Sequence, residues 1–214
     1  MQLSTSWARA RVTLALTVAT TAVYVLLSLL DLGYPAATWG GFVPARVSGL
    51  FPDPGSAPVW LTPLTAAFLH ANIIHLAFNL LILVFCGRPT EAVIGPVGFG
   101  LLYLLGAYAA AAVQYLIDPT SIVPMIGASG AISAVLGAYA ILFGRNKVKV
   151  ANPTLALWLN AFWLMAAWVI LQLVVVFSFA GMGGAQIAVG AHIGGFIAGV
   201  ALANPLLLLR YRRA

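Results

Sequence analysis

Residues 125–144 read MIGASGAISAVLGAYAILFG, a stretch without charge that directly follows Pro124. Its small and apolar residues predict a membrane-spanning helix over 129–144. Such a helix is roughly 22 Å long, whereas the hydrocarbon core of a bilayer is about 30 Å thick. If Arg145 marks one membrane face, Ser129 lies below the other, where non-helical backbone is tolerated only beside protein or a water-filled cavity. The stretch therefore predicts a hydroxyl group and a helix N-terminus in a buried polar pocket.

Two interpretations of this stretch stay open on its residues alone. Gly130, Ala134 and Gly137 would let a neighbouring helix approach closely, which is a sufficient structural reason for small side chains. The other interpretation is chemical, because a Ser within the run GASG at the mouth of a membrane helix is unusual. The choice depends on which other polar groups the chain brings to the same place.

The composition indicates an all-α polytopic membrane protein. The chain has 214 residues, of which 63% are hydrophobic and 7% charged, and its mean hydropathy is +1.05. A soluble fold cannot use that composition. The single Cys86 excludes an internal disulfide. The net charge of +6 lies at the ends of apolar runs, so we expect a lipid bilayer and no nucleic acid as partner.

The apolar runs predict six membrane spans in one domain. They cover 12–30, 69–86, 93–117, 126–144, 155–180 and 187–209. With the N-terminus in the cytoplasm, every Lys and Arg except Arg46 lies inside, so the positive-inside rule puts both termini there. We expect a basic tail over 1–11, a six-span membrane domain over 12–209 and a second basic tail over 210–214.

Three connecting features complete the predicted topology. The segment 31–61 combines prolines with aromatic residues, which predicts a structured outer loop rather than a disordered connector. Trp158, Trp163 and Trp168 of the fifth span are interpreted as packing and interface residues. The glycine-rich residues 181–184 predict either a mobile lid over a buried pocket or a slack connector.

Polar side chains gather near the outer ends of the second, fourth and sixth spans. His75 and Asn79 share a helix face, with His70 nearer the outer water. Such groups are costly within a span and face the bundle interior by default, where interhelical hydrogen bonding is the plain structural explanation. In the sixth span, His192 lies above a groove formed by Gly195 and Gly199, which could bring its imidazole to Ser129.

These groups can support nucleophilic chemistry. A Ser paired with a His base is the minimal activated oxygen nucleophile, and nearby donors could stabilise a developing oxyanion. All four acidic residues are expected in loops, so a dyad rather than a triad is predicted: Asp31, Asp53, Glu91 and Asp118. An aspartyl protease lacks its two membrane carboxylates here, and no HExxH pattern is present. A zinc site of three His stays conceivable despite poor spacing, but we expect no metal and no cofactor.

The runs HANIIHLAFN (70–79), GASG (127–130) and GAHIGG (190–195) resemble, in this order, the compact six-span rhomboid intramembrane serine proteases. The resemblance extends from the second span to the end of the chain. It implies Ser129 as nucleophile, His192 as general base and acid, and an oxyanion site of His75, Asn79 and the Ser129 N–H. The implied supporting residues are His70, Gly127, Gly130, Ser133, Gly195 and Gly199. The implied substrates are single-span membrane proteins, cleaved near the outer surface. The sequence predicts no particular oligomeric state.

Two features depart from the family pattern, and rival functions stay open. Many rhomboids carry a Trp-Arg pair in the first external loop, whereas here Trp60 is followed by Leu61. Four residues after the nucleophile, rhomboids often have an aromatic ring against the catalytic His, whereas this chain has Ser133. We therefore expect a less firmly held His192. The main alternative is a proteolytically silent rhomboid-like protein that binds or escorts transmembrane helices. A small transporter is disfavoured because no span carries a charge to couple an ion. We expect a multi-pass protein in the plasma (inner) membrane of a prokaryote.

Overall fold

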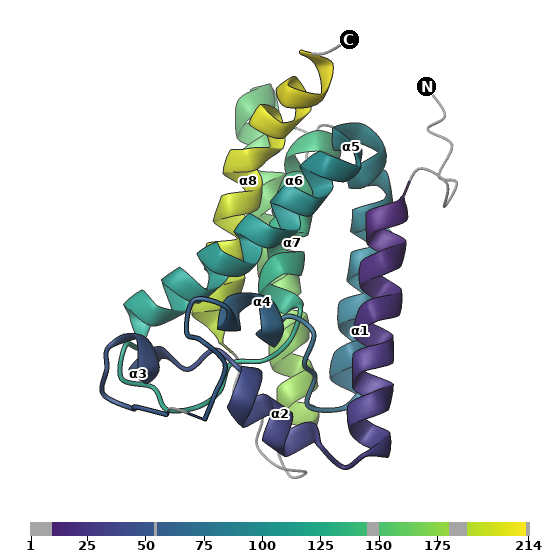
Figure 1. The fold of residues 1–214 in the computed structure, drawn as a ribbon. Helices are drawn as coiled ribbons and strands as arrows, with labels where there is room; N and C mark the ends of the chain where they lie inside the picture. Colours follow the sequence, from purple (N-terminus) through teal and green to yellow (C-terminus); the bar gives the residue numbers. More distant parts are fainter. Residues whose placement is uncertain (1–9, 54, 145–149, 180–187, 213–214) are drawn as a thin grey trace.

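A computed structural model describes residues 10–53, 55–144, 150–179 and 188–212, with the side chains of 174–179 excepted. Within these residues the regular elements are helices (Figure 1), in the order α1 (Arg11–Leu29), α2 (Gly33–Gly40), α3 (Pro44–Val47), α4 (Thr62–Ala66), α5 (Ile73–Ile117), α6 (Ser129–Phe143), α7 (Pro153–Phe179) and α8 (Val189–Tyr211). Helices α1, α5, α7 and α8 are long and apolar enough to cross a membrane, and α6 is shorter. The predicted all-α membrane bundle is confirmed at this level.

Helix α5 corrects the prediction of a loop between the second and third spans, which it joins as two helical limbs. The structure is helical through 87–94 and breaks only at Gly95, with φ 78° and ψ 166°. Glycine adopts this positive φ without steric cost, and Pro96 then starts the second limb. Figure 1 shows the two limbs of α5 meeting at the end of the molecule where α1 begins and α8 ends. The chain therefore turns between the two limbs of α5 within two residues, Gly95 and Pro96.

Glu91 is buried in this part of α5, so its predicted loop position is wrong. Its carboxylate accepts hydrogen bonds from the backbone N–H groups of Val12 (2.9 Å) and Thr13 (2.7 Å) and from the Thr13 hydroxyl (2.7 Å). The first N–H groups of a helix have no partner within the helix, and a carboxylate there also favours the helix dipole. Glu91 thus caps α1, although it lies 78 positions after Thr13 in the sequence.

Helix α6 lies at the centre of the bundle, between α5 and α8 (Figure 1). All of its residues from Ser129 to Ala138 are buried. A methyl group at Gly195 of α8 would overlap the carbonyl oxygen of Gly130, and one at Gly199 would overlap that of Ala134. The two backbones therefore touch, and the predicted packing through small residues is confirmed.

The described residues of the segment 31–61 are structured, as predicted. Helices α2 and α3 lie in this segment and α4 follows it, and Phe42 forms an antiparallel bridge with Met125 through hydrogen bonds of 3.0 and 2.8 Å. The N–H of Gly127 donates to the carbonyl of Ala66 at 2.9 Å. Both contacts fix the segment that leads into Ser129.

Candidate active site

Ser129 and His192 come together at the starts of two packed helices. The Ser129 Oγ lies 2.8 Å from the His192 Nε2, although the residues are 63 positions apart. Ser129 is the first residue of α6 and is 9% exposed, whereas His192 lies in the first turn of α8 and is 4% exposed. The glycine contacts between α6 and α8 set this distance, because larger residues would separate the two helices.

His75 and Asn79 face the residues just before Ser129. Gly127 has a φ of 117°, and a methyl group there would lie 2.7 Å from the His75 Nε2 and 3.8 Å from the Asn79 Nδ2. Only glycine fits both this backbone conformation and this close approach. The imidazole and the amide therefore lie beside the turn that precedes Ser129.

The Asn79 side chain is fully buried, and within the described part of the chain neither its Oδ1 nor its Nδ2 has a hydrogen-bond partner. Burying an unpaired amide costs about 1–3 kcal/mol. Such a group is available to a ligand that enters the site. The His192 Nδ1 is also buried and has no partner among the described residues.

His70 lies before α5, not within a helix, because Asn72 caps the helix and its Oδ1 accepts from the His75 N–H at 2.8 Å. The His70 Nε2 accepts from the Ala128 N–H at 3.4 Å, so this ring contacts the residue next to Ser129. Burial, and then the neighbouring His75, lowers the pKa of His70 to about 3. His70 is therefore neutral near pH 7, as an acceptor must be.

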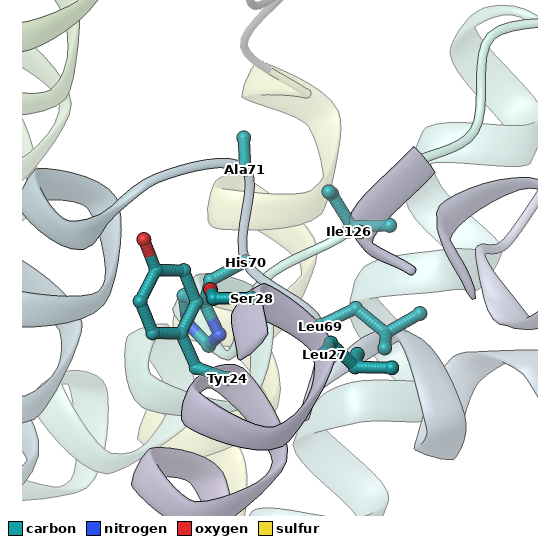
Figure 2. Close-up of a pocket in the computed structure, with 8 residues that line it drawn as sticks. Tyr24, Leu27, Ser28, Leu69, His70, Ala71 and Ile126 are labelled. Carbon is teal, nitrogen blue, oxygen red and sulfur yellow. The ribbon is translucent and has the colours of Figure 1, made fainter. Parts of the chain in front are cut away.

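A small pocket of about 70 Å³ lies beside His70. Figure 2 shows it between His70 with its neighbours and the last turns of α1, where Tyr24, Leu27 and Ser28 line it. Neither Ser129 nor His192 lines this pocket. The pocket therefore lies next to His70 and does not include the Ser–His pair.

Ser133 and Trp168 contact the Ser129–His192 pair and each other. The Ser133 hydroxyl donates to the Ser129 carbonyl at 2.7 Å and accepts from the Trp168 Nε1–H at 2.9 Å. The Trp168 ring lies 6.0 Å from the His192 ring, centroid to centroid, at an interplanar angle of 58°. The Ser133 hydroxyl thus bonds both a backbone carbonyl of α6 and the indole of Trp168.

Residues 58–209, more than half of the chain, match the family described as Rhomboid domain. The chain belongs to the rhomboid family. It is therefore an integral, multi-pass membrane protein, and the resemblance carried by the three motifs is confirmed.

The similar proteins come from several kingdoms. RHOMBOID-like protein 1 of Arabidopsis thaliana is 31% identical over 144 residues, which are 67% of this chain and 34% of that protein. Rhomboid protease GluP of Bacillus subtilis is 30% identical over 140 residues, which are 65% and 25% of the two chains. Rhomboid-related protein 3 of Homo sapiens is 36% identical over 83 residues, which are 39% and 20%. The alignments thus span about a fifth to a third of these relatives.

In this rhomboid the structure brings the predicted site residues together on α5, α6, α8 and the turns before α5 and α6: His70, His75, Asn79, Gly127, Ser129, Gly130, Ser133, His192, Gly195 and Gly199. In the described ranges no group of three or more His, Cys, Asp or Glu side chains is placed to hold one metal ion. The glycine-rich segment predicted as a lid or connector lies outside the described residues.

Trp168 is the site neighbour that sequence reasoning missed. Nothing in the sequence distinguishes one tryptophan of the fifth span from the other two, and all three are predicted to be packing or interface residues. In the structure Trp158 and Trp163 are exposed on the bundle surface, whereas Trp168 is 3% exposed and contacts the Ser–His pair. Only the packing of α7 distinguishes it.

Proposed function

We propose that this rhomboid is an intramembrane serine endopeptidase that uses a Ser129–His192 dyad. The observation that carries the proposal is the 2.8 Å approach of the Ser129 Oγ to the His192 Nε2 in a buried site at two helix starts. A Ser hydroxyl becomes a useful nucleophile when a base at this distance accepts its proton.

In the proposed reaction the Ser129 oxygen attacks the carbonyl carbon of the scissile peptide bond while the His192 Nε2 takes its proton. The protonated imidazole then gives the proton to the leaving amine, and the C–N bond breaks to leave an acyl-enzyme. Water, deprotonated by the same imidazole, hydrolyses the ester and restores the Ser129 hydroxyl. The Nδ1 of His192 keeps its proton throughout.

The oxyanion formed in each step needs donors that are fixed in advance. The proposed donors are the Asn79 amide, the His75 ring and the backbone N–H of Ser129. Asn79 suits this role because its buried amide lacks a partner within the described residues. The Ser129 N–H belongs to the first turn of α6, where N–H groups have no partner within the helix and the helix dipole is positive.

The substrate and topology are part of the same proposal. We infer six membrane crossings, counting the two limbs of α5 separately, with both termini in the cytoplasm and Ser129 toward the outer face. A dyad at this depth fits a single-span membrane protein that is cleaved near the outer surface. A prokaryotic plasma membrane stays a prediction, since the similar proteins come from plants, mammals and a bacterium.

Cleavage of a single-span reporter protein in liposomes tests the proposal. We expect the wild-type chain and Ser48→Ala, a control Ser directly after α3 that contacts Pro119 and Tyr115, to cleave the reporter at similar rates. Ser129→Ala, His192→Ala and the double variant should all fall to the same background, because the two residues act as a unit. Undiminished cleavage by Ser129→Ala would contradict the mechanism. A wild-type chain that binds the reporter without cleaving it would favour the silent, helix-binding alternative.

A further inference from the structure

Among the described residues, no hydrogen bond fixes the far ring nitrogen of the proposed base, His192. Its Nε2 faces Ser129, and its Nδ1 has no partner among the described residues. In a triad an acid holds the far nitrogen and orients the imidazole. Glu91, the one buried acid among the described residues, caps α1 instead. The orientation of His192 must therefore come from packing.

Trp168 is the aromatic residue in position to supply that packing. Its ring lies 6.0 Å from the His192 ring at an angle of 58°, within the range of tilted aromatic pairs. Its Nε1–H donates to the Ser133 hydroxyl, which in turn donates to the carbonyl of Ser129. One indole thus contacts the proposed base directly and the backbone of the proposed nucleophile through Ser133.

Trp168 reaches this position from a helix with limited support. Few of the described α7 side chains are fully buried, and the exposed ones include Leu155, Phe162, Trp163 and Ile170. The buried ones are Ala156, Asn160, Ala161, Trp168 and Gln172, of which Trp168 is the largest. Helices α6 and α8 touch backbone to backbone at Gly195 and Gly199, whereas α7 reaches α6 through side chains such as Trp168. A shift of α7 would therefore move the indole while α6 and α8 stay packed.

We propose that Trp168 is a positioning residue that orients His192 and so makes alignment of the dyad depend on α7 lying against α6. The inference rests on the proposed function, which it deepens. The indole replaces a ring that position 133 does not provide, and Ser133 fits here because its small side chain leaves room for the indole and accepts its N–H. With α7 in place the dyad is aligned, and with α7 displaced the imidazole loses its lateral support.

The test compares full-length variants in liposomes, measuring kcat and KM for the single-span reporter and the melting temperature of each variant. Trp168→Leu removes both the ring and the N–H, Trp168→Phe keeps a ring, and Trp163→Leu is the matched α7 control. We expect Trp168→Leu to lower kcat by about ten- to a hundredfold with little change in KM, because misalignment of about 1 Å has effects of that size. Trp168→Phe should recover most of this loss, and Trp163→Leu should behave like the wild type.

The Ser133 link is tested by a double-mutant cycle. Ser133→Ala and Trp168→Phe each disrupt the same hydrogen bond, so the double variant should be little slower than the slower single variant. If Trp168→Leu does not fold, the cycle decides, since Ser133→Ala and Trp168→Phe remove much less buried volume. A kcat within twofold of the wild type in folded Trp168→Leu, or a fully additive cycle where Trp168→Leu does not fold, would overturn the inference.

These outcomes are distinguishable from failure of the proposed function. A wild-type chain that cleaves in a Ser129-dependent manner, with Trp168 variants altered only in melting temperature, would leave the protease proposal intact and overturn the positioning role. A wild-type chain without Ser129-dependent cleavage would overturn both.

Discussion

At the scale of single residues, Asn79 shows a conflict between stability and proposed chemistry. A fully buried amide without a partner in the described structure weakens the fold, and an apolar residue of similar size would be a better packing element. An oxyanion would provide the missing hydrogen bond. This conflict is typical of a functional position.

Asn79→Ala should lower kcat by up to about a hundredfold, with a much smaller effect on KM, because the amide is proposed to bind the transition state more strongly than the substrate. The melting temperature should change little, since no protein hydrogen bond described at Asn79 is lost. Asn160→Ala on α7, another buried Asn with an unpaired Nδ2, is the control and should keep its kcat. A change confined to melting temperature would instead assign Asn79 to packing.

Gly127→Ala should lower both stability and activity. The positive φ of 117° is strained for alanine by about 1–2 kcal/mol, and its methyl group would displace the His75 ring. Melting temperature and reporter cleavage measure the two effects. Gly33→Ala is the matched control, because nothing lies within 4 Å of the added methyl group. Wild-type cleavage by Gly127→Ala would show that this turn does not position the site.

At the scale of elements, the α1–α5 junction shows what sequence can and cannot predict. The bounds of α6 follow from its own residues, which predict 129–144 where the structure has Ser129–Phe143. Arg88 and Glu91 suggest a loop by their polarity, yet the structure continues as helix, because Glu91 has its hydrogen-bond partners on α1. Nothing near Glu91 in the sequence indicates a partner 78 positions away.

The same distinction separates the site residues. Ser129, His75, Asn79 and His192 are predictable because short local motifs hold them at helix starts. Trp168 is not, because only tertiary packing of α7 selects it from three tryptophans spaced five residues apart. The sequence thus predicts which polar side chains gather at the candidate site better than the contacts that hold them in place.

Glu91→Gln should destabilise the fold while leaving the kcat of the folded protein unchanged. The amide retains one acceptor oxygen and loses the charge, so we expect a loss of about 1–2 kcal/mol, the usual range for a helix cap. The melting temperature in detergent measures this loss, and Asp31→Asn, an exposed acid, is the control of equal charge change. An unchanged melting temperature would mean that Glu91 does not hold α1.

At the scale of the whole molecule, the position of the dyad relative to the membrane depends on orientation. The dyad lies at the end of the bundle opposite the Gly95 turn, since α6 and α8 both begin there (Figure 1). Basic residues concentrate at the end with the turn, where Arg210 donates to the Ala92 carbonyl. The positive-inside rule therefore predicts the dyad toward the outer face.

A topology assay measures this orientation. A reporter enzyme that is active only outside the cytoplasm should stay silent when it is fused after Arg213, and it should be active when it is inserted after Gly49. Gly49 lies in the outer segment, and a methyl group there would have nothing within 4 Å. Activity after Arg213 would reverse the proposed threading and the direction of the site.

The measurement that tests the central claim most directly is labelling of the full-length protein in membranes by a fluorophosphonate probe, followed by mass spectrometry of the labelled peptide. Such probes react with a hydroxyl that a neighbouring base activates. We predict a single modification at Ser129, which is absent from folded His192→Ala and from the denatured wild-type chain. Labelling at another residue, or undiminished labelling of Ser129 in His192→Ala, would contradict a Ser129–His192 dyad.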